Sequence, residues 1–224
     1  MLAKSDGLSL EQHIQGLLDV SETFQKAFPI LEKFFTNGVF WKYLKTSILF
    51  HDIGKSTVGF QNLMTKNIKY RFRHEVLSAI VAQNYSGNEL IINAVLAHHK
   101  NFETLKELLN EYTNNEKYQQ DRWIAKEFED LDNAWIEDFL SKNYIQPKTL
   151  ALNDLNSVIK KWTSKRAIKK ISELEKFQNI FLSASLSICD HNASAGIKNI
   201  PIIQQDNFAF LYNPKYESYH HQKI

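Results

Sequence analysis

Six side chains spread over four segments of the chain are of the kinds that bind transition metals. They are His51 and Asp52, His74, His98 and His99, and Asp190. Imidazole nitrogens and carboxylate oxygens are the ligands that divalent transition metals commonly take from proteins. A carboxylate beside a histidine can bridge two ions, while histidines and a second carboxylate from other segments fill the remaining positions. The sequence therefore favours a metal-dependent hydrolase over a binding module.

Phosphoester hydrolysis is the reaction that suits such a set. Two ions roughly 3.5–4 Å apart can each bind a phosphate oxygen, activate a water molecule and stabilise the leaving alkoxide. Each histidine alone is a weak signal, because a lone histidine in a helical domain is more often a hydrogen-bonded polar residue than a ligand. The prediction depends on the combination.

The elements that must position these residues are predicted to be helices. Only seven glycines and four prolines interrupt the 224 residues, and apolar residues recur mostly every three or four positions, which predicts an almost wholly α-helical fold. Gly54 is placed to end one helix as a left-handed cap. We expect a first helix that starts after Ser9, which caps it together with Gln12 three residues on. Further helices are expected over Val39–Ile53, Arg73–Asn84, Asn88–His99 and Glu173–Ala193. The candidate ligands then lie close to helix ends, where polar groups can meet without crossing a core.

The rest of the chain has a different composition. The region 101–171 is rich in charged and amide residues, with helical segments at 103–112 and 121–140, and predicts a helical insertion on the metal-bearing core. Within this region, a basic helix face beside Trp162 could guide a single strand of nucleic acid. The helical spacing of the apolar residues instead favours a tryptophan in the core and basic side chains that are exposed to solvent. Residues 200–224 predict a strand, a docked extension or a linker after one domain at 1–199.

Composition narrows the class of protein. A chain with 43% hydrophobic residues can form a core, and a net charge of +2 is too balanced to indicate a nucleic-acid binder by itself. The single cysteine, Cys189, excludes an internal disulfide framework and predicts a buried thiol. The sequence has no secretion signal and no apolar run long enough to span a bilayer, so we expect a cytoplasmic protein with no membrane contact.

The chain resembles the HD phosphohydrolase superfamily and, within it, the HD nuclease domain of the type I CRISPR-associated helicase-nuclease. A His-Asp pair alone is a weak signal, but five segments in one order are a strong one, and the Arg-His-Glu and double-histidine segments favour the CRISPR branch. The segments are Glu11-Gln12-His13, His51-Asp52-Ile53-Gly54-Lys55 with Phe60-Gln61, Arg73-His74-Glu75 with Ser78-Ala79, Ala94-Val95 with His98-His99, and Asp190-His191-Asn192-Ala193-Ser194.

This resemblance implies an all-α HD bundle with two metal ions at converging helix ends. The implied ligands are His13, His51, Asp52 and Asp190 for one ion, and Asp52, His74, His98 and His99 for the other. Asp52 would be the bridge, and Lys55 would face the scissile phosphate and stabilise its charge. Iron, manganese, nickel or cobalt suits these ligands better than magnesium. Arg73 and Ser194 are candidate substrate contacts, although solvation of a helix surface explains Arg73 nearly as well.

The resemblance also implies a biological role, namely cleavage of the single-stranded DNA displaced when a CRISPR surveillance complex opens its target. The sequence has no phosphate-binding Gly-x-x-x-x-Gly-Lys loop, so a helicase would be a separate subunit or a following domain. Two alternatives stay open. One is an HD phosphohydrolase acting on a nucleotide or cyclic nucleotide, which a closed pocket would favour. The other is a non-catalytic interaction module, which the apparently complete ligand set disfavours because clustered buried polar groups are costly.

Overall fold

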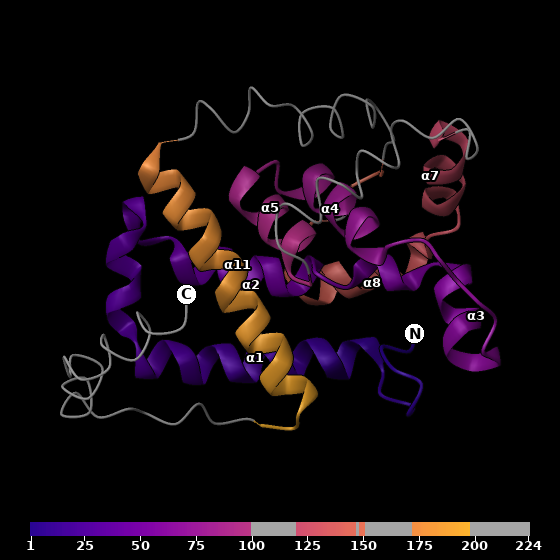
Figure 1. Ribbon diagram of the computed structural model, residues 1–224, viewed down its shortest axis with the longest axis horizontal. Helices are drawn as coiled ribbons and strands as arrows, with labels where there is room; N and C mark the ends of the chain where they lie inside the picture. Colours follow the sequence, from indigo (N-terminus) through magenta and orange to yellow (C-terminus); the bar gives the residue numbers. More distant parts are fainter. Residues whose placement is uncertain (100–119, 147, 151–171, 198–224) are drawn as a thin grey trace, which may run out of the picture.

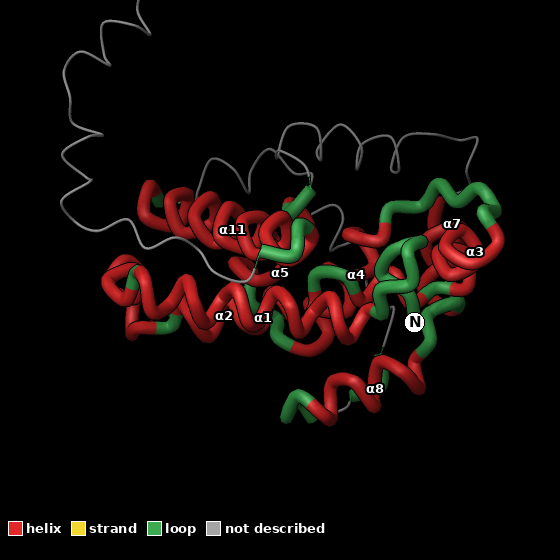
Figure 2. The backbone as a smooth tube through the Cα atoms, turned by 90° about the horizontal axis from the view of Figure 1, so that it is seen from below, coloured by secondary structure: helices red, strands yellow, loops and turns green. Residues whose placement is uncertain are grey.

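The computed structural model describes residues 1–99, 120–146, 148–150 and 172–197. Over these residues every regular element is a helix (Figure 2), and β pairing is limited to two isolated bridges. The elements are α1 (Leu10–Ala27), the 3-10 helices η1 (Pro29–Phe34) and η2 (Thr36–Gly38), α2 (Phe40–Phe50), the 3-10 helix η3 (Ile53–Ser56), α3 (Val58–Lys66), α4 (His74–Tyr85), α5 (Glu89–Ala97), α7 (Gln120–Glu129), α8 (Asn133–Lys142) and α11 (Glu173–Ser194). The prediction of an all-α fold is confirmed. In this described part of the chain, no helix is both long and apolar enough to cross a bilayer.

Among the described helices, the two longest are α1 and α11, and each begins at a serine capping box. The Ser9 hydroxyl accepts a hydrogen bond from the Gln12 amide at 3.1 Å, and the Gln12 side chain accepts one from the Ser9 amide. Ser172 and Glu175 form the same reciprocal pair at the start of α11. Such pairs satisfy two of the free N–H groups at a helix start. The predicted start of α1 is therefore confirmed, and α11 runs one residue beyond its predicted end.

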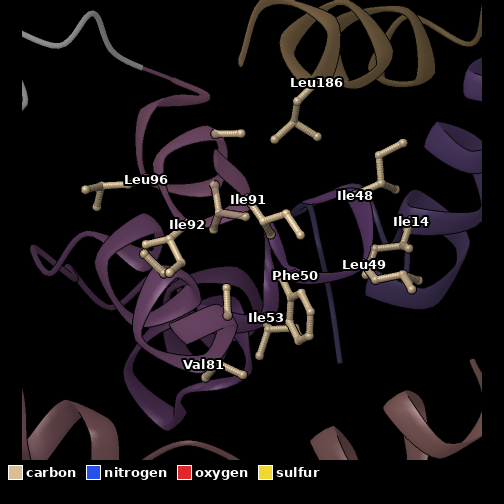
Figure 3. Packing of buried hydrophobic residues seen from close by; sticks show 14 of the residues in the cluster. Ile14, Ile48, Leu49, Phe50, Ile53, Val81, Ile91, Ile92, Leu96 and Leu186 are labelled. Carbon is tan, nitrogen blue, oxygen red and sulfur yellow. The ribbon is translucent and has the colours of Figure 1, made fainter. Parts of the chain in front are cut away.

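One apolar core holds these helices together. In Figure 1, α4 and α5 lie side by side, and α11 passes diagonally across α1 and α2. Figure 3 shows Ile14, Ile48, Ile91 and Leu186 meeting from α1, α2, α5 and α11. Each of these side chains is at most 4% exposed, and burying one such side chain is worth about 1.5–3 kcal/mol. The helix α4 is enclosed on every side, since residues 75–82 are all buried.

The helix before His51 is shorter than predicted, and the prediction of a left-handed cap at Gly54 was wrong. α2 ends at Phe50, a turn carries His51, and η3 follows. Gly54 has no positive φ, yet a Cβ atom there would lie 2.1 Å from the carbonyl oxygen of His74. Its amide donates a hydrogen bond to the Ser78 hydroxyl at 2.9 Å. The absent side chain is what allows η3 to lie against the start of α4.

The helical segment predicted over 121–140 is two helices, α7 and α8. Asp132 caps α8 by accepting a hydrogen bond from the Trp135 amide at 2.9 Å. Between the helices, Leu131 is buried and pairs with Thr57 in an isolated bridge. Side chains of α8 such as Ile136 belong to the common core. This part of the predicted insertion therefore completes the core rather than decorating it.

Several predictions fall on residues outside the described ranges. They are the helical segment at 103–112, the basic face beside Trp162, the extension at 200–224 and the domain boundary near residue 199. These stay predictions.

Candidate metal centre

The predicted ligands come together in space although five different parts of the fold carry them. His13 lies in the first turns of α1, and Asp190 lies near the end of α11. The other members are His51 and Asp52 in the turn after α2, His74 as the first residue of α4, and His98 and His99 directly after α5. The prediction that the ligands meet near helix ends holds for each of them.

Asp52 is the centre of the cluster and is only 1% exposed. Its Oδ2 lies 3.3 Å from Nε2 of His13 and 3.3 Å from Nε2 of His51. Its Oδ1 lies 3.1 Å from Nε2 of His74 and 3.8 Å from Nε2 of His98. Each oxygen of one carboxylate thus faces its own pair of histidines, as expected of a carboxylate that bridges two ions.

The ligand atoms form two groups that share Asp52. Within each group the atoms lie within 4.8 Å of one another, and the groups are Asp52, His74, His98 and His99, and His13, His51 and Asp52. Asp190 adds to the smaller group, because its Oδ1 lies 3.1 Å from Nε2 of His13. Its Oδ2 also lies 3.9 Å from Nδ1 of His99. Asp190 therefore contacts both groups, which the predicted assignment to one ion did not include.

Unpaired buried atoms indicate that this cluster fits metal ions. Among the described residues, Nε2 of His51, His74 and His98 and Oδ1 of Asp52 are buried without a hydrogen-bond partner. These nitrogens lie 3.1 to 3.8 Å from carboxylate oxygens of Asp52 but lack hydrogen-bond geometry. Leaving a buried polar atom unpaired costs about 1–3 kcal/mol. Nitrogen and oxygen atoms that converge in this way match the shell of a divalent transition metal.

Backbone carbonyl groups orient two of the histidines. Nδ1 of His51 lies 2.7 Å from the carbonyl oxygen of Ile48, and Nδ1 of His98 lies 2.6 Å from that of Val95. A carbonyl only accepts, so the proton of each neutral ring is on Nδ1 and the lone pair is on Nε2. From α11, the Ser187 hydroxyl donates to the carbonyl oxygen of His98 at 2.8 Å. Both rings are thus held with the metal-binding nitrogen toward Asp52.

The charge state of Asp52 suits a ligand. Burial would raise the pKa of this carboxyl, but the His51 ring and the Lys55 ammonium group lower it, and the pKa stays well below its ordinary value. The closest of these groups is Lys55, whose Nζ lies 2.7 Å from Oδ2 of Asp52. Asp52 is therefore ionised at neutral pH and can bind a cation with either oxygen.

The pKa values of the histidines differ because their surroundings differ. Burial, together with the charges of His98 and His74, lowers the pKa of His99 to about 3, and burial lowers the pKa of His74. These two rings are neutral at pH 7, which is the form that binds metal. Burial would lower the pKa of His13 as well, but hydrogen bonds to Asp190 and Asp52 raise it. His13 binds a metal ion only as the neutral ring, so these hydrogen bonds shift metal binding at His13 toward higher pH.

The predicted substrate residues lie at the edge of this cluster. Lys55 pairs with Asp52, and its side chain is 12% exposed. Arg73 pairs with Glu75, and the Ser194 hydroxyl donates to Oδ1 of Asp190 at 3.4 Å. His191, beside Asp190 in the sequence, is exposed. The structure places Lys55, Arg73 and Ser194 at the edge of the site, and their contacts with substrate stay predictions.

Glu75 belongs to the site although no role was predicted for it. It is 2% exposed, and its Oε2 lies 3.5 Å from Nδ1 of His74. Burial would raise the pKa of Glu75, but the charges of His74 and Arg73 lower it to about 2. The sequence signal was its place directly after a candidate ligand. An acidic residue in the first turn of a helix is common, however, and indicates no contact by itself.

A family model describing the HD domain matches residues 16–135, which is more than half of the chain. The chain belongs to the HD domain family. The matched part of this HD domain includes five of the clustered ligands and excludes the two that lie nearest the ends of the sequence, His13 and Asp190. HD domains are metal-dependent hydrolases, and both the helical fold and the ligand cluster agree with that class.

The HD domain is also similar to a curated protein from an archaeon. It is 33% identical over 87 residues to the CRISPR-associated endonuclease Cas3-HD of Pyrococcus furiosus, and the alignment covers 35% of this chain. The match spans 37% of that protein, so it compares little more than a third of either chain.

The buried thiol next to the site leads to a first prediction. Cys189 is 0% exposed, and burial together with the charge of Asp190 raises its pKa to about 12. Because the thiolate is the reactive form, we expect the folded protein to release no chromophore from Ellman's reagent at neutral pH. One thiol per chain should appear once denaturant is added. Rapid labelling of the native protein would contradict the burial of Cys189.

Proposed function

We propose that this HD domain is a metal-dependent nuclease that hydrolyses phosphodiester bonds of single-stranded DNA in type I CRISPR interference. The observation that carries the proposal is the position of Asp52, with each carboxylate oxygen facing a separate pair of histidines. Two-metal sites of this kind serve the in-line displacement of phosphate esters. Membership of the HD family and the similarity to Cas3-HD support a nuclease among such enzymes.

The residues would hold two divalent transition-metal ions such as iron, manganese, nickel or cobalt, which suit a histidine-rich shell better than magnesium. One ion would be held by His13, His51, Asp52 and Asp190, and the other by Asp52, His74, His98 and His99. When bound, the ions supply a Lewis acid for the phosphate and a nucleophilic water at neutral pH.

The exposure of the side chains indicates from which side a phosphate approaches. The side chains of His51 and Asp52 are 0% and 1% exposed, whereas those of His74 and His99 are 14% and 31% exposed. Substrate therefore approaches over His74 and His99. The ammonium group of Lys55 reaches Asp52 while keeping some contact with solvent. There it can donate to a phosphate oxygen and stabilise the charge that develops in the transition state.

The proposed partners follow from the same assignment. We place the enzyme in the cytoplasm, where its substrate is the DNA strand displaced by a CRISPR surveillance complex. A helicase, as a partner subunit or as a domain of a longer chain, would feed it that strand. Arg73 and Ser194, at the edge of the cluster, are the proposed contacts with the phosphate backbone.

The decisive assay uses circular single-stranded DNA, because a circle has no ends and reports internal cleavage alone. With manganese, nickel or iron added to the purified chain, we expect linear product that a chelator abolishes. Closed circular double-stranded DNA of the same sequence is the matched control and should stay intact. Bound metal with no cleavage of the single-stranded circle would overturn the proposal and point to a nucleotide phosphohydrolase.

A further inference from the structure

We infer that Glu75, held in place by Arg73, is a positioning residue that fixes His74 as a ligand of the ion shared with His98 and His99. The inference deepens the proposed function and rests on the metal centre described above. It concerns a contact on the far side of the His74 ring from Asp52.

The two nitrogens of His74 have different surroundings. Nε2 lies 3.1 Å from Oδ1 of Asp52 and, among the described residues, has no hydrogen-bond partner. Nδ1 faces Glu75, whose Oε2 lies 3.5 Å away. A carboxylate at that position favours the tautomer with the proton on Nδ1, which leaves the lone pair of Nε2 for a metal. The 3.5 Å contact is long for a hydrogen bond, and contacts of this kind often tighten when the site is loaded.

The location of His74 explains why a carboxylate is needed there. His51 and His98 follow the ends of helices, so each Nδ1 reaches the carbonyl oxygen three residues earlier, at Ile48 and Val95. His74 is instead the first residue of α4, and an extended residue precedes it. No helical turn lies before it to offer such a carbonyl. A side chain therefore has to supply the acceptor, and Glu75 is the one beside it.

Arg73 fixes the carboxylate of Glu75 in turn. Nε of Arg73 donates to Oε2 of Glu75 at 3.2 Å, and its terminal nitrogen donates to Oε1. A two-point contact between guanidinium and carboxylate sets the plane of the carboxylate as well as its position. Glu75 is 2% exposed, so water does not compete strongly for it. Arg73 is 31% exposed at its side chain and retains donors for a phosphate.

The expected consequence is a difference between the two ion sites. A carboxylate that accepts from a ligating histidine makes the ring a stronger donor, and loss of such an outer partner typically weakens metal binding about 10- to 100-fold. His51 and His98, by contrast, have neutral carbonyl partners. Glu75 therefore strengthens metal binding at the site that contains His74 and does not affect metal binding at the site of His13 and His51.

Titration with Co²⁺, followed by its visible absorption, tests this directly. Compared with wild type, Glu75→Gln should weaken one of two binding events by about 10- to 100-fold and leave the other unchanged. Glu129→Gln, the same change at an exposed residue of α7, is the matched control and should bind both ions as wild type does. Unchanged binding by Glu75→Gln, or equal weakening of both events, would overturn the inference.

A second measurement needs no variant and so does not depend on how Glu75→Gln folds. In ¹⁵N-labelled wild-type protein loaded with diamagnetic Zn²⁺, we expect His74 to carry a slowly exchanging proton on Nδ1 and the metal on Nε2. The reverse assignment would overturn the role of Glu75. A wild-type chain that binds no ion at all would instead contradict the proposed metal centre, and with it the proposed function.

Discussion

Asp52→Asn should abolish nuclease activity and weaken the binding of both metal ions. The substitution keeps the shape of the side chain but removes the charge that both groups of histidines face. Removing a residue that only hydrogen-bonds a metal ligand weakens metal binding by at most roughly 100-fold. Asp52 contacts both groups of ligands directly, so its substitution should weaken metal binding by more than that. Elemental analysis of metals after dialysis, together with cleavage of single-stranded DNA, measures both effects.

The exposed residue His191 offers a control for this substitution. It lies beside Asp190 in the sequence but points to solvent, so His191→Ala should keep both ions and full activity. Circular dichroism of each variant separates loss of metal from loss of fold. Retention of two tightly bound ions by Asp52→Asn would show that Asp52 does not bridge them.

Gly54→Ala is expected to cause the largest loss of stability of any conservative change near the site. The new Cβ would lie 2.1 Å from the carbonyl oxygen of His74 and 3.0 Å from Cβ of Leu77. The first of these is a backbone atom that cannot rotate away, so η3 and α4 must separate. Forcing extra atoms into a packed region costs about 1–3 kcal/mol or more. For a chain of this size, 3 kcal/mol corresponds to a fall in Tm of roughly 6–12 °C. Differential scanning calorimetry without added metal measures it.

Gly16→Ala is the matched control for that experiment. Gly16 lies inside α1, and a Cβ there would make an ordinary 3.5 Å contact with Ala193. Alanine is favoured over glycine within a helix by about 0.5–1 kcal/mol, so this variant should be as stable as wild type or more so. If Gly54→Ala had the same Tm as the Gly16→Ala control, the close approach of η3 to α4 would be wrong.

Features with a local cause could be predicted from the sequence. The capping box at Ser9 depends on residues four positions apart or fewer, and it marks the start of α1 as expected. Asn88, predicted to open a helix, caps α5 by accepting from the amides of Leu90 and Ile91. The seven ligand candidates could be found because their residue types are distinctive and the family pattern orders them. The structure brings all seven together.

Features with a tertiary cause could not be predicted. Position 54 requires glycine because α4, which begins twenty residues later, packs directly against it. The helix α3 was not predicted, and none of its residues is buried. The break between α7 and α8 follows from Leu131, which turns inward and pairs with Thr57. The contact of Glu75 with His74 depends on the fold of the turn before α4, so the position of Glu75 next to His74 in the sequence does not by itself predict the contact.

The most direct test of a carboxylate-bridged pair of ions is anomalous X-ray diffraction from crystals grown with Mn²⁺. We expect two anomalous peaks, one on each side of the Asp52 carboxylate, separated by roughly 3.5–4 Å. One peak should lie against His13 and His51, and the other against His74, His98 and His99. A single peak bound by one histidine group, or peaks that do not share Asp52, would contradict the bridge.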